Sequence, residues 1–254
     1  MNEPQVIEGA QAFALGEGPI GALMVHGYTG SPQSIRGLGE YLAGRGIAVL
    51  GPRLPGHGTT WQDLNSRTRA EWRETVAEGY EEIASGRDEV FIVALSFGVA
   101  LSLDFIARNP VKVKGLVALA GLVDTNDPRR HFAPLIKRVT RSIPGVANDI
   151  ADPGGHELAY DRLPTSSTHE MLKMLKEVRA ELPRVDCPIL VMHGRGDHTV
   201  KPYNAEMIIE NVSSIDKELV WCENSYHVIT LDKDRDEVFR RTYGFIKERS
   251  SHAV

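Results

Sequence analysis

The sequence predicts an α/β fold with a mainly parallel sheet, and two observations support this. Short, continuously apolar segments recur along the chain, which is typical of strands that are buried on both faces. Segments of helical periodicity separate them, and strands that alternate with helices at this spacing form βαβ units with right-handed crossovers. The strands are expected at residues 21–25, 47–50, 90–95, 115–121, 188–194 and 218–222.

Helices are expected between these strands, and local signals predict several of their ends. Ser31 is expected to cap the first helix, with Pro32 at its first position and glycines at its end. The next helix is expected over about 70–85, where apolar side chains recur at helical spacing. Two more helices are expected from the residue after Ser96 to near Pro110, and over about 233–247.

The alternation of strands and helices stops over residues 122–183, which we interpret as a lid inserted into a core formed by 1–121 and 184–254. The segment contains helical and loop-like sequence and no strand candidate. A first lid helix is expected around residues 132–143, where apolar side chains form a stripe along one face. A second lid helix is expected to start at a capping box, Ser167 with Glu170. The apolar stripe of the first helix could line a tunnel for an acyl chain, or it could only attach the lid to the body. This stripe contains Phe132, Leu135, Ile136, Val139 and Ile143.

Composition excludes several classes of protein. The net charge is -5 over 254 residues, and its interspersed charges form no basic stripe of the kind that nucleic-acid binding needs. No segment approaches the length of a transmembrane helix, and the N-terminus lacks the features of a secretory signal. Cys187 and Cys222 fit no metal-ligand spacing and are expected to be buried thiols of a reduced, cytoplasmic protein. We expect no metal and no cofactor.

Residues 90–101 predict a strand, a sharp turn and a helix, with Ser96 at the turn. In such an elbow the hydroxyl of a nucleophile stands above the sheet, and the residues two before and two after it must be small. Ala94 and Gly98 meet this requirement, although glycine is usual at both positions and Ala94 departs from that pattern. The alternative is a serine that only caps a buried helix.

Loops that follow parallel strands gather at one edge of the sheet. Asp197 and His227 follow the last two strands, so both are expected beside Ser96, in the chain order Ser, Asp, His that this architecture uses. His227 would accept the proton of the Ser96 hydroxyl, and Asp197 would orient the imidazole. Asp124 also follows a strand and is the alternative acid, whereas His198 is expected to face solvent or a neighbouring carbonyl.

The oxyanion of an acyl-transfer reaction needs two backbone N–H donors. Phe97 can supply one at the positive end of its helix, and Tyr28, in the glycine-rich loop after the first strand, is the candidate for the other. His26 and His57 stand beside glycines and are expected to brace their loops by hydrogen bonds to carbonyl groups.

Together these motifs resemble the α/β-hydrolase superfamily and, more narrowly, the bacterial monoacylglycerol lipases and small thermostable carboxylesterases. The resemblance runs over nearly the whole chain, and its most specific part is Asn-Ser-Tyr-His-Val-Ile-Thr-Leu-Asp at 224–232. It implies an α/β-hydrolase fold with a small lid, a triad of Ser96, Asp197 and His227, and an oxyanion hole from Tyr28 and Phe97. Other matching segments are 26–30, 52–58 and 157–160.

These features predict a carboxylic-ester hydrolase that acts through an acyl-enzyme on monoacylglycerols or other medium-chain esters. Glu157 could accept hydrogen bonds from a glycerol headgroup or could be a solvated lid carboxylate. A thioesterase, an acyltransferase or a C–C hydrolase could use the same triad. A binding protein on an inactive scaffold is disfavoured because all three reacting groups are present.

The expected partner is a small ester molecule. We expect no nucleic-acid partner and no stable membrane anchor, with weak contact to a lipid interface through the lid. A monomer and a homodimer are both compatible with the sequence.

Overall fold

The computed structural model describes residues 4–109 and 112–253. Seven strands form the main sheet in the order β1-β3-β2-β4-β5-β8-β9, and every neighbouring pair is parallel except β1 with β3. The predicted mainly parallel α/β sheet is therefore confirmed. The strands are β1 (Phe13–Leu15), β2 (Ile20–Val25), β3 (Ala48–Gly51), β4 (Glu89–Leu95), β5 (Gly115–Leu119), β8 (Ile189–Gly194) and β9 (Lys217–Cys222).

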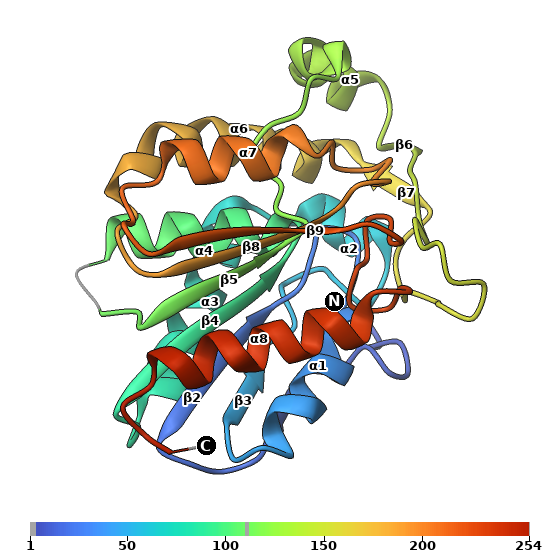
Figure 1. Ribbon diagram of the computed structural model, residues 1–254. Coiled ribbons are helices and arrows are strands. Elements are labelled where there is room, and N and C mark those ends of the chain that lie inside the picture. The colour runs from blue at the N-terminus through green and yellow to red at the C-terminus, as the bar shows by residue number, and fades with distance from the viewer. Residues whose placement is uncertain (1–3, 110–111, 254) are drawn as a thin grey trace.

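Helices cover both faces of this sheet (Figure 1). One face carries α1 (Gln33–Ala43) and α8 (Arg235–Arg249), and the other carries α3 (Arg69–Ala84), α4 (Phe97–Arg108) and α7 (Tyr203–Asn211). Successive side chains of a strand point to opposite faces, so β2 contributes Leu23 to one core and Met24 to the other. Burial on both faces explains why the strands read as continuous apolar segments.

The connection from β5 to β8 is long and contains helices and strands of its own. Figure 1 shows that one of these helices, α5 (Ala133–Val139), stands away from the sheet. The long helix near its end, α6 (Thr165–Glu181), packs against α3, α4 and α2 (Trp61–Ser66). We call residues 122–183 the inserted segment. Its elements are the 3₁₀ helix η1 (Pro128–Phe132), α5 (Ala133–Val139), β6 (Ser142–Pro144), β7 (Arg162–Pro164), α6 (Thr165–Glu181) and the 3₁₀ helix η2 (Leu182–Arg184).

The structure corrects the predicted details of this segment. No strand was expected there, yet β6 and β7 form a two-stranded antiparallel sheet, and Ile143 lies in β6 rather than in the first helix. The predicted capping box is also wrong, because α6 begins at Thr165 without a side-chain cap. The hydroxyl of Ser167 instead shares a hydrogen bond with the Tyr28 hydroxyl, and Glu170 pairs with Arg69.

The predicted cap of α1 is wrong as well. The helix begins at Gln33 after Pro32, and no side-chain cap is present. The buried Ser31 hydroxyl has no partner among the described residues, whereas the Ser31 carbonyl accepts hydrogen bonds from the backbone N–H and the hydroxyl of Ser34. Among the described residues, no helix combines the length and the apolar character that crossing a membrane requires.

Candidate active site

Ser96 lies at the sharp turn between β4 and α4, as the sequence predicts. Its φ of 56° and ψ of -119° lie outside the usual regions for a non-glycine residue. A Cβ atom at Gly98 would lie 2.3 Å from the carbonyl oxygen of Val25, so only glycine lets α4 start this close to β2. Ala94 is fully buried in β4, and its methyl group is accommodated there. The turn therefore presents the Ser96 hydroxyl at the carboxyl end of the sheet.

The structure brings His227 and Asp197 to this hydroxyl. The loops after β8 and β9 carry Asp197 and His227, and both loops meet at the carboxyl end of the parallel strands. His227 Nε2 lies 3.0 Å from Ser96 Oγ, and His227 Nδ1 lies 2.8 Å from Asp197 Oδ2. All three residues are buried. This chain of hydrogen bonds can withdraw the serine proton during nucleophilic attack.

Asp197 is held by more groups than His227 alone. Its Oδ1 accepts the backbone N–H of Thr199 (2.9 Å) and of Val200 (2.7 Å). Its Oδ2 lies 3.1 Å from Nε2 of His193, a fully buried residue of β8. The sequence predicts only that His193 belongs to a strand, because its contact with Asp197 depends on how the loop after β8 folds back.

The charges of this group shift the pKa values in opposite directions. Burial would raise the pKa of Asp197, but the adjacent His227 and the hydrogen bonds from His193 and His227 hold it below its ordinary value. Burial would lower the pKa of His227, but the charge of Asp197 and its hydrogen bond, then the charges of Glu157 and Asp149, raise it above 6.5. The pair is thus suited to an ionised carboxylate that stabilises an imidazolium.

The loop after β2 lies directly beside Ser96. A Cβ atom at Gly27 would lie 3.0 Å from Ser96 Cβ, so Tyr28 follows at close range. Phe97 is the first residue of α4, and the first N–H groups of a helix have no partner within it. The two residues predicted to supply oxyanion donors therefore lie in the loop and the helix that adjoin Ser96. The Tyr28 side chain reaches α6, where its hydroxyl lies 2.7 Å from Ser167 Oγ.

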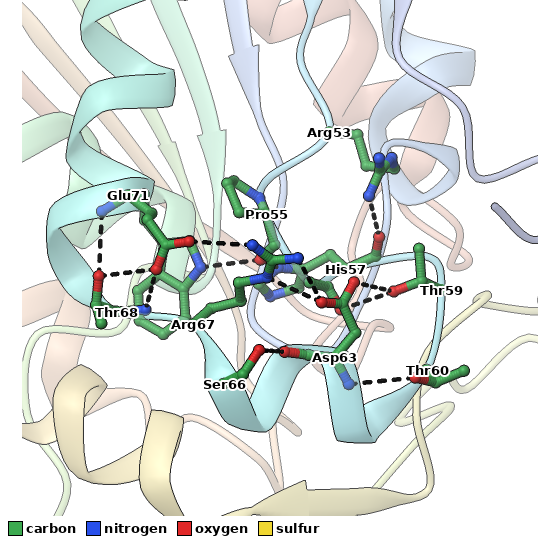
Figure 2. Close-up of polar contacts among 12 residues, drawn as sticks. Arg53, Pro55, His57, Thr59, Thr60, Asp63, Ser66, Arg67, Thr68 and Glu71 are labelled. Carbon is green, nitrogen blue, oxygen red and sulfur yellow. Dashed lines mark hydrogen bonds and ion pairs between the residues drawn. The ribbon is translucent and has the colours of Figure 1, made fainter. Parts of the chain in front are cut away.

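His26 and His57 brace the surrounding loops, as the sequence predicts. His26 Nδ1–H donates to the Gly27 carbonyl (2.9 Å), and its Nε2 accepts from the Leu54 backbone (3.1 Å). His57 Nδ1–H donates to the Pro55 carbonyl (3.1 Å), and burial lowers the pKa of His57 to about 4. Figure 2 shows this loop and the beginning of α3 joined by a network of polar contacts in which Arg67 pairs with Asp63 and Glu71.

A cavity of about 410 Å³ opens above the Ser96 hydroxyl. Its floor contains Ser96 and His227, and much of its wall comes from the inserted segment. Apolar side chains that line it include Leu122, Ile136, Ile143, Leu163, Met171 and Leu172. The cavity is therefore large enough and apolar enough for a small ester with an acyl chain.

Glu157 lines the same cavity as Ser96 and His227. A Cβ atom at Gly30 would lie 2.7 Å from Glu157 Oε1, so the carboxylate rests against the loop after β2. Burial raises the pKa of Glu157, and the nearby His227 partly opposes this. The carboxylate is thus partly withdrawn from water. This favours the headgroup role over a fully solvated lid carboxylate.

Asp124 and His198 line the same cavity, but their polar contacts are with groups other than the Ser96 hydroxyl. The Asp124 carboxylate pairs with Arg179 (2.6 Å) and Arg130 (3.2 Å), so it does not serve as the partner of His227. His198 was expected to face solvent or a carbonyl. Its side chain is 62% exposed, but its Nδ1 lies 2.9 Å from the carboxylate of Asp149, a residue that sequence reasoning did not single out.

The fold and this arrangement of side chains define an α/β-hydrolase. A family model described as serine aminopeptidase, S33 (Hydrolase_4) matches residues 22–234, and the chain belongs to this family. A thermostable monoacylglycerol lipase of Bacillus sp. (strain H-257) is 34% identical over 252 residues, which are 96% of this chain and 97% of the relative. A carboxylesterase of Bacillus subtilis (strain 168) is 28% identical over 239 residues, 93% of this chain and 96% of the relative.

Solved structures agree with these sequence relatives. A structure described as that of LipS and LipT, two metagenome-derived lipolytic enzymes, superposes with a TM-score of 0.93 at 34% identity. The match covers 96% of this chain and 100% of that chain. The predicted resemblance to bacterial monoacylglycerol lipases and carboxylesterases is therefore confirmed.

Proposed function

We propose that the protein hydrolyses carboxylic esters through an acyl-enzyme formed on Ser96, and that monoacylglycerols are among its substrates. The observation that carries the mechanism is the hydrogen-bonded chain from Ser96 through His227 to Asp197 at the floor of an apolar cavity. The predicted enzyme class, a carboxylic-ester hydrolase, is confirmed by relatives named monoacylglycerol lipase and carboxylesterase.

In the proposed mechanism, neutral His227 accepts the Ser96 proton while Oγ attacks the ester carbonyl. The N–H groups of Tyr28 and Phe97 stabilise the oxyanion that forms. The imidazolium then donates its proton to the departing alcohol, leaving the acyl group on Ser96. A water molecule then attacks this acyl-enzyme while His227 accepts its proton. The imidazolium returns that proton to Ser96 Oγ as the bond to the acyl group breaks and the carboxylic acid leaves.

We propose that Glu157 binds the alcohol part of the substrate. A partly buried carboxylate that has lost contact with water can regain hydrogen bonds from the hydroxyl groups of a glycerol headgroup. The apolar side chains of the inserted segment would cover the acyl chain, so this segment would act as the lid of the enzyme.

The headgroup role is tested with Glu157→Leu on two substrates of equal acyl length, a monoacylglycerol and an ethyl ester. We expect kcat/KM to fall roughly 10- to 100-fold on the monoacylglycerol, since one or two hydrogen bonds to a charged group are lost, and to change far less on the ethyl ester. Glu74→Leu, at an exposed position of α3, is the matched control. Equal losses on both substrates would contradict the headgroup role, and a thioester in the same panel distinguishes a thioesterase.

We further propose that the inserted segment contacts an anionic lipid surface. Three apolar side chains on and beside α5 are largely exposed: Phe132 (61%), Leu135 (60%) and Val139 (81%). Lys137, Arg138 and Arg141 are exposed or half-exposed beside them, and residues 128–148 contain no Asp or Glu. Exposed apolar side chains beside basic ones are typical of surfaces that bind anionic lipid. A cytoplasmic location and the oligomeric state stay predictions of the sequence.

A further inference from the structure

The loop that carries Asp197 is attached to the inserted segment through one carboxylate. Asp149 Oδ2 accepts the backbone N–H of His198 (2.9 Å) and of Thr199 (3.1 Å), and also the Thr199 hydroxyl (3.1 Å). Asp149 Oδ1 accepts His198 Nδ1–H (2.9 Å). The carboxylate is nearly buried, with 9% of the side chain exposed. It therefore fixes the two residues that directly follow Asp197.

The loop that carries His227 is attached to the same residue through its backbone. The Asp149 carbonyl accepts the N–H groups of His227 (3.0 Å) and Val228 (3.3 Å). One residue of the inserted segment thus holds both the loop of the acid and the loop of the base. These contacts are long-range in sequence, because His198 and Thr199 lie 49 and 50 positions after Asp149 and His227 lies further along the chain.

The position of Asp149 is itself secured by a second carboxylate. Asp232 is fully buried and accepts the backbone N–H groups of Ala151 (2.9 Å), Asp152 (2.9 Å) and Tyr226 (2.8 Å). These bonds tie residues just after Asp149 to the residue just before His227. The hydrogen bonds of Asp232 therefore hold the backbone next to Asp149 in place, so Asp149 can in turn hold the loops that it binds.

A shared donor connects Asp149 to the proposed acid. The Thr199 N–H lies 3.1 Å from Asp149 Oδ2 and 2.9 Å from Asp197 Oδ1. A displacement of this N–H would move one of the donors that orient Asp197, and the Asp197 carboxylate in turn orients His227.

We propose that Asp149 is a positioning residue for the Asp197 and His227 pair, acting from the inserted segment through its carboxylate and its carbonyl. The inference rests on the proposed triad. It makes the inserted segment part of the support of the catalytic groups, in addition to a cover over the substrate.

The negative charge of Asp149 also affects the pKa of His227, and a purely structural role of Asp149 would not affect that pKa. The charged groups that act on His227 are Asp197, Glu157 and Asp149, and all three raise its pKa. Replacing the Asp149 carboxylate by an amide keeps an oxygen that can accept the N–H of His198 and Thr199, but it removes the negative charge. The pKa of His227 then falls, because less negative charge stabilises the imidazolium.

The experiment compares Asp149→Asn with Asp152→Asn in the same loop, whose carboxylate contacts Gly154 and Arg235 instead of the triad loops. Hydrolysis of p-nitrophenyl butyrate is measured from pH 5 to pH 9, with thermal unfolding of each variant. For Asp149→Asn we expect kcat to fall about tenfold, as for the loss of one good hydrogen bond to a charged group, and the acidic limb to move down by roughly half a pH unit. For Asp152→Asn we expect neither change.

Both changes are required, so the absence of either in folded Asp149→Asn would overturn the inference. Equal changes in the two variants would overturn it as well. If the unmodified protein itself neither hydrolyses the ester nor reacts at Ser96, the proposed triad fails first, and the two failures are thereby distinguished.

Discussion

At the scale of single residues, the proposed chemistry depends on His227 being neutral when the substrate is attacked. The imidazole is buried, which favours its neutral form, yet the negative charges around it favour the protonated form and raise its pKa. Only the neutral imidazole can accept the Ser96 proton. Because the pKa of His227 is raised, the imidazole becomes neutral only at higher pH, and activity begins at higher pH.

We therefore predict an acidic limb of kcat/KM above pH 6.5, the ordinary pKa of histidine, with a plateau at higher pH. The measurement is a pH profile with a substrate that does not ionise in this range, together with a stability check at each pH. Undiminished activity at pH 5 would contradict the assignment of His227 as the base.

At the scale of elements, the elbow between β4 and α4 depends on close contact with β2. Ser96 has a positive φ, and Gly98 lies against the backbone of Val25. A backbone carbonyl cannot move aside as the end of a long side chain can. The position of the hydroxyl is thus fixed by how closely a helix approaches a neighbouring strand.

Gly98→Ala should destabilise the fold and lower activity. The new methyl group would meet the Val25 carbonyl at 2.3 Å, which we expect to cost about 1–3 kcal/mol in the free energy of unfolding, as overpacking does. Gly244→Ala in α8 is the control, since nothing lies within 4 Å of its added Cβ atom. It should be neutral or stabilising by up to about 1 kcal/mol. Urea unfolding of both variants checks this, and equal stabilities would contradict the packing argument.

The sequence predicted the long elements and failed on short ones, for physical reasons. Burial on both faces gives strands such as β4 an unmistakable apolar pattern. In contrast, β6 and β7 have three residues each, too few to show a period. The capping box failed because Ser167 binds the Tyr28 hydroxyl, a partner 139 positions away that no local pattern reveals.

At the scale of the whole molecule, the parallel sheet gathers functional groups from distant parts of the chain at one edge. This general rule is why Ser96, Asp197 and His227 could be expected to lie together from the sequence. The supporting groups His193 and Asp149 could not be expected, because their contacts depend on the path of loops. The proposed lipid contact likewise depends on which apolar side chains the folded chain leaves exposed.

We predict that the protein binds anionic vesicles through α5 and its neighbours. It should cosediment with phosphatidylglycerol vesicles more than with phosphatidylcholine vesicles, and high salt should weaken the binding because part of the attraction is electrostatic. Leu135→Ser with Val139→Ser should lose most of the binding. Ile215→Ser is the control, since Ile215 is fully exposed but precedes β9 and so lies at the opposite edge of the sheet. Equal binding by both variants would contradict the lipid surface.

The most direct test of the central claim is the reaction of the folded protein with a fluorophosphonate, followed by intact-protein and peptide mass spectrometry. The account predicts one phosphonyl adduct on Ser96, slow labelling of His227→Ala and no adduct on Ser96→Ala. An unlabelled Ser96 in active protein, or an adduct on another residue with Ser96→Ala still active, would contradict it.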